Sequence, residues 1–225
     1  MKIQLKYGRI PNKTMKIMSR IKAHLKYYLF RLQQSTPFRQ EVDKINMCSG
    51  SINLPGYLNL DISASADLPI NLAKRNLPFP DRSIEVVVCM SAINYFTRDR
   101  AQELINEIFR VLKPDGMTRF GVQDLEKLAS LYVKKDRDFF FQKLPDGSYR
   151  FEGPTLGDKF VAWMYGYESG GYTCSYFYDY ESLAYLFKEA GFSIVERKKY
   201  QQSRIAGIEL LDNRPGQMFF LEAQK

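Results

Sequence analysis

The sequence predicts an α/β protein built around a doubly wound β-sheet. From residue 44 onward, short apolar and β-branched runs alternate with segments whose apolar residues recur at the helical period. The runs, above all residues 84–89, are apolar enough for a sheet covered on both sides. At 225 residues, the chain is also short enough for a single core. In such a fold, a ligand is expected beyond the carboxyl ends of the strands.

The elements can be assigned in order along the chain. Apolar character and β propensity predict six strands, at residues 44–47, 58–61, 84–89, 117–122, 192–196 and 218–223. Helical periodicity predicts three helices in the same region, at residues 101–112, 125–133 and 180–190. Gly191 is placed to end the last of these helices, because glycine readily adopts a left-handed conformation.

A basic segment precedes this α/β region. Residues 1–40 contain ten Lys and Arg and no Asp or Glu, so the remainder sums to 23 minus 25, or −2. Within residues 14–32, the helical period places apolar side chains at Met18, Ile21, Leu25, Tyr28 and Leu32. We therefore expect a basic amphipathic helix, joined through residues 33–41 to a domain at residues 41–225.

Three interpretations of this helix remain open. Its apolar stripe could cover the domain while its charges face water. Alternatively, the stripe and the charges together suit an anionic membrane surface. Nucleic acid is the weakest interpretation, because the near-neutral domain offers no extended basic surface.

Cysteine content and hydropathy limit the functional class. The three cysteines are odd in number and far apart, and none has a Cys or His at metal-ligand spacing. The chain also has no signal-peptide pattern at its start and no uncharged run long enough to cross a bilayer. We expect a cytoplasmic protein without a metal, located at the inner membrane face if the basic helix binds lipid.

An aromatic-rich insertion occupies residues 136–180, where the periodic pattern is lost. Its rings could form a lid over a planar acceptor or sugar, with Gly166 and Gly170-Gly171 giving mobility. Equally, they could form a small satellite core beneath a long insertion. The sequence favours neither alternative.

The strand ends carry the candidate binding residues. Cys48-Ser49-Gly50 forms a small-residue turn after the first strand, where backbone can approach a ligand closely. Asp61 ends the second strand and could accept hydrogen bonds from ribose hydroxyls. Asn71-Leu72 could recognise the edge of an adenine beside apolar walls. Each of these residues could also serve only as part of an ordinary turn or cap.

Five motifs follow one another in a characteristic order. They are I-N-M-C-S-G at residues 45–50, L-P-G-Y-L-N-L-D at 54–61, L-P-F-P-D at 77–81, R-V-L-K-P-D-G at 110–116 and V-Q-D-L at 122–125. This series resembles the core of class I S-adenosylmethionine (SAM) dependent methyltransferases, in particular those associated with bacterial surface-polysaccharide synthesis. The resemblance implies a Rossmann-like, mostly parallel sheet of seven strands whose final strand is reversed.

The resemblance also implies a cofactor, an acceptor and a set of site residues. The cofactor would be SAM, and the acceptor a small molecule or carbohydrate, such as a glycan or lipid-linked glycan intermediate. The residues implied around SAM are Met47, Cys48, Ser49, Gly50, Asp61, Ile62, Asn71, Leu72 and Ser91. Tyr95 and Asp124 are the candidate catalytic residues, with Asp124 as the base, although Asp124 suits a helix N-cap equally well.

The sequence departs from the family pattern at the implied site. Cys48 replaces the first glycine of the turn, Asn71 replaces an aspartate, and S-A-I-N-Y at residues 91–95 stands where H-V-L-E-H is usual. These departures motivate an alternative, a catalytically degenerate methyltransferase fold that acts as a binding or scaffolding protein. A nicotinamide oxidoreductase is a weaker alternative, because its fingerprint requires three glycines in the first turn.

Overall fold

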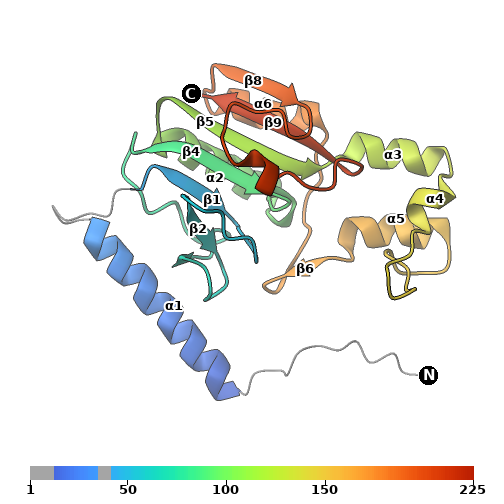
Figure 1. Cartoon of the computed structure of the whole chain (residues 1–225), viewed down its shortest axis with the longest axis horizontal. Coiled ribbons are helices and arrows are strands. Elements are labelled where there is room, and N and C mark those ends of the chain that lie inside the picture. Colours follow the sequence, from blue (N-terminus) through green and yellow to red (C-terminus); the bar gives the residue numbers. More distant parts are fainter. Residues whose placement is uncertain (1–12, 35–41) are drawn as a thin grey trace.

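A seven-stranded sheet lies at the centre of the computed structural model, which describes residues 13–34 and 42–225 (Figure 1). The strand order is β3-β2-β1-β4-β5-β9-β8. Every pair from β3 to β5 is parallel, and β9 alone runs antiparallel to its neighbours. The strands are β1 (Lys44–Met47), β2 (Leu58–Asp61), β3 (Leu68–Pro69), β4 (Ile84–Met90), β5 (Leu112–Gln123), β8 (Ile194–Lys198) and β9 (Met218–Gln224).

This sheet confirms the predicted fold class, including the reversed final strand. All six strands predicted from the sequence are present, and β1 and β2 have the predicted bounds. The seventh strand, β3, was not predicted because its two residues are too few to show a period. Successive strands lie to one side of β1 as far as β3 and to the other side from β4 onward. The direction of winding therefore reverses between β1 and β4, which is where such folds form a crevice.

Two amphipathic helices cover one face of the sheet, α2 (Arg98–Val111) and α6 (Tyr180–Glu189). Thr97 and Asp179 cap them by accepting hydrogen bonds from backbone N–H groups in the first turn. Their apolar faces join the inward side chains of the strands in the main core, which includes Ile45, Leu104, Ile108, Phe120, Leu183 and Phe187. Figure 1 shows both helices behind the sheet.

The opposite face is covered by connecting chain. The segments at 48–57 and 199–217 cross it, and the latter contains only the short 3-10 helix η2 (Ile208–Leu210). Together with the sheet they form a second apolar cluster of Leu54, Val88, Ile205, Ile208 and Leu211. Within this layer, the fully buried Arg119 forms ion pairs with Asp212 at 2.5 Å and with Glu222 at 2.8 Å. The pair with Asp212 attaches residues 199–217 to the sheet, whereas Glu222 belongs to β9 itself.

The aromatic-rich insertion has its own apolar cluster. It lies around α3 (Leu125–Val133), α4 (Arg137–Phe140) and α5 (Leu156–Tyr165), and its buried members are Leu128, Phe140, Phe151, Trp163, Cys174 and Phe177. The sequence predicted α3 with these bounds but missed α5, although Thr155 and Asp158 form a capping box at its start. A hairpin of β6 (Glu168–Ser169) and β7 (Tyr172–Thr173) extends from the cluster toward the sheet (Figure 1).

The basic helix α1 (Lys13–Gln34) is present, but its contact with the domain differs from the predicted one. Tyr27 and Phe30 are buried against the loops after β2 and β3, and Lys26 Nζ donates a hydrogen bond of 2.7 Å to the Ala66 carbonyl. The predicted apolar stripe does not cover the domain, so that interpretation is wrong. Its members remain 54–65 % exposed, namely Met18, Ile21, Leu25, Tyr28 and Leu32. The predicted linker lies largely outside the described residues.

Candidate functional site

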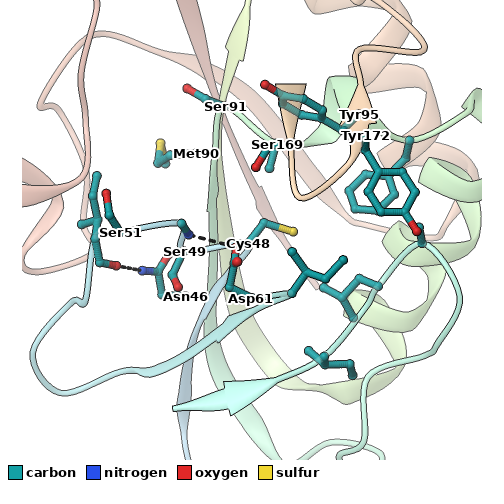
Figure 2. A pocket seen from close by; sticks show the side chains of 18 of the residues that line it. Asn46, Cys48, Ser49, Ser51, Asp61, Met90, Ser91, Tyr95, Ser169 and Tyr172 are labelled. Atoms are coloured by element: carbon teal, nitrogen blue, oxygen red, sulfur yellow. Dashed lines mark hydrogen bonds between the residues drawn. The ribbon is translucent and has the colours of Figure 1, made fainter. Parts of the chain in front are cut away.

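A cavity of about 260 Å³ lies at the carboxyl ends of β1, β2 and β4 (Figure 2). This volume is close to the lower limit of roughly 300 Å³ for ligand sites in proteins. Turns at the strand ends form one wall, which we call the strand-end wall: residues 48–52, 61–62, 70–73 and 90–92. Two remote segments form a second wall, the loop wall, which comprises Ser169, Tyr172, Leu211, Asn213 and Arg214.

The turn after β1 and the end of β2 converge on the cavity. Gly50 N–H donates to Asp61 Oδ2 at 3.0 Å, and Ser63 N–H donates to Asp61 Oδ1 at 2.8 Å. Gly50 has a φ of 59°, and a Cβ at this position would meet no atom within 4 Å. Below the turn, Asn46 Nδ2 bridges to Asn59 Oδ1 at 3.0 Å and holds the two strands together. The carboxylate of Asp61 is thereby fixed beside the glycine turn.

Cys48 occupies the position where the family pattern has glycine, and its backbone is left-handed, with a φ of 56°. A side chain costs about 1–2 kcal/mol in this conformation, so the substitution strains the turn. Its sulfur lies in the centre of the site in Figure 2. Cysteine therefore narrows the cavity but leaves the turn intact.

The hairpin β6–β7 closes the cavity beside Asn71. Tyr172 Oη lies 2.9 Å from Asn71 Nδ2 and accepts its hydrogen bond, while Asn71 Oδ1 accepts one from Ala73 N–H. The hairpin tip rests on Ile62, because a Cβ on Gly170 would lie 2.7 Å from Ile62 Cγ2. Gly170 also has a φ of 59°, so both its conformation and its close packing require glycine.

Ser91, Tyr95 and Arg214 meet at the β4 side of the cavity. Arg214 Nη2 donates to Ser91 Oγ at 3.0 Å, and Ser91 itself has a φ of 56°. Burial is the largest cause that raises the pKa of Tyr95 to about 12. The neighbouring thiol of Cys174 raises this pKa further, and the positive charge of Arg214 opposes the shift. Tyr95 is therefore protonated at neutral pH and acts as a hydrogen-bond donor rather than as a base.

Most of the predicted site residues line the cavity, but two do not. Met47 points into the main core and is fully buried there. Asp124 caps α3 by accepting a hydrogen bond from Lys127 N–H, and its other oxygen accepts one from Arg197 Nη2 at 2.9 Å. Cys48, Ser49, Gly50, Asp61, Ile62, Asn71, Leu72, Ser91 and Tyr95 all lie in the lining.

The sequence interpretation missed the loop wall. Tyr172 belongs to the aromatic insertion, and Arg214 belongs to a turn-like segment, D-N-R-P-G at 212–216. Neither residue follows a strand directly, so their spacing gave no indication of a site. Among residues 13–34 and 42–225, no group of three or more His, Cys, Asp or Glu side chains is arranged to hold a metal ion. In the same part of the chain, no helix has the length and apolar character needed to span a membrane.

Comparison with known proteins gives one family match. Residues 62–120 match the model of a methyltransferase domain family. The match begins just after Asp61 and includes Asn71, Ser91 and Tyr95, whereas the turn with Cys48 lies outside it. Comparison with curated protein sequences gives no match.

Several solved structures have a similar arrangement of elements. A SAM-dependent methyltransferase from Thermotoga maritima has a TM-score of 0.47 and 16 % identity, over 94 % of this chain and 96 % of that one. A second, from Methanosarcina mazei, has a TM-score of 0.47 and 18 % identity, over 83 % of this chain and 93 % of that one. A third, from Archaeoglobus fulgidus, has a TM-score of 0.48 and 10 % identity, over 95 % of this chain and 100 % of that one.

Proposed function

We propose that the chain is a class I SAM-dependent methyltransferase, that its cavity holds SAM and that the acceptor is a small molecule or a carbohydrate; the match of residues 62–120 to a methyltransferase domain family supports this proposal. When bound, SAM supplies a methyl group activated by a positively charged sulfur. The observation that carries this proposal is the convergence of Gly50 N–H and the Asp61 carboxylate on one side of the cavity, 3.0 Å apart.

The residues of the strand-end wall fit the nucleoside part of SAM. Asp61 accepts one backbone hydrogen bond on each oxygen, and each oxygen retains a lone pair for a ribose hydroxyl. Ser49 Oγ is buried in the wall without a hydrogen-bond partner, which is unusual unless a ligand supplies one. The open space above Gly50 leaves room for the ligand to approach the protein backbone closely.

We place the adenine beside Asn71 and Leu72. The Asn71 side chain offers both an amide N–H and a carbonyl oxygen, which match the edge of an adenine. The apolar side chains of Ile62, Ile70 and Leu72 lie in the same part of the lining and suit its faces. In this arrangement, the Tyr172 hydroxyl exchanges its bond to Asn71 for one to water or ligand.

Catalysis by this site depends on orientation. Methyl transfer is an in-line displacement, so a site that aligns the acceptor and excludes water provides much of the rate. We propose that Tyr95, which lines the cavity, donates a hydrogen bond to the acceptor. Asp124 is not placed to remove the proton of the acceptor. One of its oxygens accepts a hydrogen bond from Lys127 N–H in the cap of α3, the other accepts one from Arg197, and Asp124 lies outside the cavity lining. We propose that residues 136–180 act as a lid whose hairpin tip selects the acceptor.

Isothermal titration with S-adenosylhomocysteine (SAH), the demethylated cofactor, tests this proposal. We expect binding in the micromolar range with one site per chain. A titration without heat at high protein concentration would contradict the proposal, provided that circular dichroism shows folded protein.

We further propose that α1 brings the enzyme to an anionic membrane surface, where a lipid-linked glycan intermediate would be its acceptor. The exposed stripe and the ten basic residues at 1–40 combine apolar insertion with electrostatic attraction of about 1 kcal/mol per nearby Lys or Arg. Tyr27 and Phe30 hold the helix on the domain and leave that stripe outward. The motif resemblance supports the same kind of acceptor.

Sedimentation with lipid vesicles tests the membrane proposal. We expect binding to vesicles that contain phosphatidylglycerol and little binding to pure phosphatidylcholine. The variant Ile21→Glu/Leu25→Glu should lose binding, because it places two charges on the stripe. Val133→Glu/Val161→Glu is the matched control, since both valines are exposed elsewhere on the surface. Equal binding by the two variants would contradict the proposal.

A further inference from the structure

One charged side chain of the loop wall has no assigned role. Arg214 is the only Lys, Arg or His among the described residues that line the cavity. Its hydrogen bonds are to neutral groups, Asn213 Oδ1 at 2.9 Å and Ser91 Oγ at 3.0 Å. In the described part of the chain, no Asp or Glu forms an ion pair with it. The cavity therefore contains a positive charge that is not in direct contact with a carboxylate of the described residues, since Asp61, the acidic residue of the lining, forms no ion pair with it.

The order of the strands indicates which part of SAM this charge would meet. Across the sheet, Asn71 follows β3, Asp61 ends β2, Gly50 follows β1 and Ser91 follows β4. Neighbouring strands lie about 4.8 Å apart, so these groups form a line across the strand ends. With adenine at Asn71 and ribose at Asp61, the amino-acid part of SAM extends toward Ser91 and Arg214.

The connection after β1 gives an independent reason for a cation here. In many doubly wound folds, a helix begins directly after the first strand, and its N-terminus binds an anionic group of the ligand. Residues 48–57 form turns and extended chain without a helix. The strand-end wall therefore lacks the positive end of a helix at this point.

We propose that Arg214 binds the carboxylate of the amino-acid part of SAM, in place of the helix N-terminus that the β1 connection lacks. This inference rests on the proposed function. Ser91 Oγ holds the guanidinium at the β4 side of the cavity, and Asp212, two residues earlier, is paired with the buried Arg119. The chain is thus anchored beside Arg214, and the guanidinium can offer a pair of N–H groups to a carboxylate.

Titrations with two ligands test the assignment. SAH carries the carboxylate, whereas methylthioadenosine has the same adenosine and sulfur but lacks the amino-acid part. We expect Arg214→Met to weaken SAH binding by about 10- to 100-fold, the loss typical of a hydrogen-bonded charge. Binding of methylthioadenosine should change by less than about twofold. Arg214→Lys should lose less than Arg214→Met, because it keeps the charge but not the forked geometry.

Arg204→Met is the matched control. Arg204 belongs to the same connection, is exposed and lies outside the cavity lining, so its loss should change neither affinity. Unchanged SAH binding in Arg214→Met would overturn the inference. An equal loss for both ligands would also overturn it. If the unaltered protein bound neither ligand, the proposed function itself would fail.

Discussion

The two walls of the cavity are held in place by different forces. In the strand-end wall, Gly50, Asp61 and Ser91 lie at or shortly after the ends of parallel strands, and the hydrogen bonds of the sheet set their positions. In the loop wall, Tyr172 and Arg214 belong to segments far along the chain. Their bonds to the first wall join Asn71 to Tyr172 and Ser91 to Arg214, across 101 and 123 residues.

This difference predicts how each wall responds to mutation. The backbone of the strand-end wall survives the loss of a side chain, because the sheet remains. The loop wall depends on a few side-chain contacts, so the loss of one contact can displace a whole segment. We expect local effects on affinity from the first wall and coupled effects on stability and affinity from the second.

The largest effect is expected where the loop wall is anchored. Asp212→Ala removes both bonds to Arg119 and leaves that buried guanidinium with Glu222 as its one carboxylate partner among the described residues. We expect the free energy of unfolding to fall by about 3–5 kcal/mol, the usual cost of breaking a buried pair. Urea denaturation measures it. Glu85→Gln, which breaks the exposed pair with Lys113, should leave the urea midpoint unchanged. Similar urea midpoints in the two variants would mean that contacts other than the Arg119–Asp212 pair hold residues 199–217 on the sheet.

In the strand-end wall, Asp61→Asn should act mainly on affinity. The amide cannot accept hydrogen bonds on both arms, so we expect SAH binding to weaken about 10- to 100-fold. Asp67→Asn is the control, because Asp67 also accepts hydrogen bonds but lies outside the cavity lining. Isothermal titration of both variants measures the difference. Equal losses would indicate damage to the β2 loop rather than to a ribose site.

A smaller effect is expected where the walls meet. Tyr172→Phe removes the hydroxyl that occupies Asn71 but keeps the ring. SAH should then bind roughly 2- to 10-fold more tightly, because one internal hydrogen bond no longer has to be broken. Tyr176→Phe, in the same insertion but outside the lining, should bind SAH like the unaltered protein. Weaker binding by Tyr172→Phe would mean that the hydroxyl contacts the ligand or holds the hairpin closed.

The smallest effect concerns the left-handed turn. Cys48→Gly and Cys48→Ala both remove the sulfur, but only glycine relieves the backbone at a φ of 56°. After the greater chain entropy of unfolded glycine is subtracted, Cys48→Gly should be more stable than Cys48→Ala by about 0.5–1 kcal/mol. Urea midpoints measure this difference. A more stable alanine variant would show that the turn is not left-handed.

The sequence predicted one wall well because its residues are adjacent to strands. Asp61 and Gly50 follow apolar runs, and the carboxyl ends of parallel strands meet at one edge of the sheet. The same proximity to a strand suggested Asp124, which follows β5 but turns away to cap α3. Position at a strand end therefore predicts where a residue lies but not where its side chain points.

The loop wall and the contact of α1 could not be predicted for a different reason. Tyr172 and Arg214 reach the cavity through tertiary packing, which leaves no period in the sequence. In α1, helical spacing correctly predicted an apolar stripe, but Tyr27 and Phe30 lie outside that stripe and make the contact. Which apolar face a helix buries depends on the surface it meets, and that surface is assembled only in the fold.

The connection at 199–217 has two roles, because it covers one face of the sheet and also lines the cavity. Its apolar side chains seal one face of the sheet, and a few residues later the same strip of chain supplies Arg214. Substitutions in this segment that alter ligand recognition can also change how well the sheet is shielded from water. Evolution of specificity at this edge is therefore constrained by folding, whereas the hairpin at 168–173 is free of that constraint.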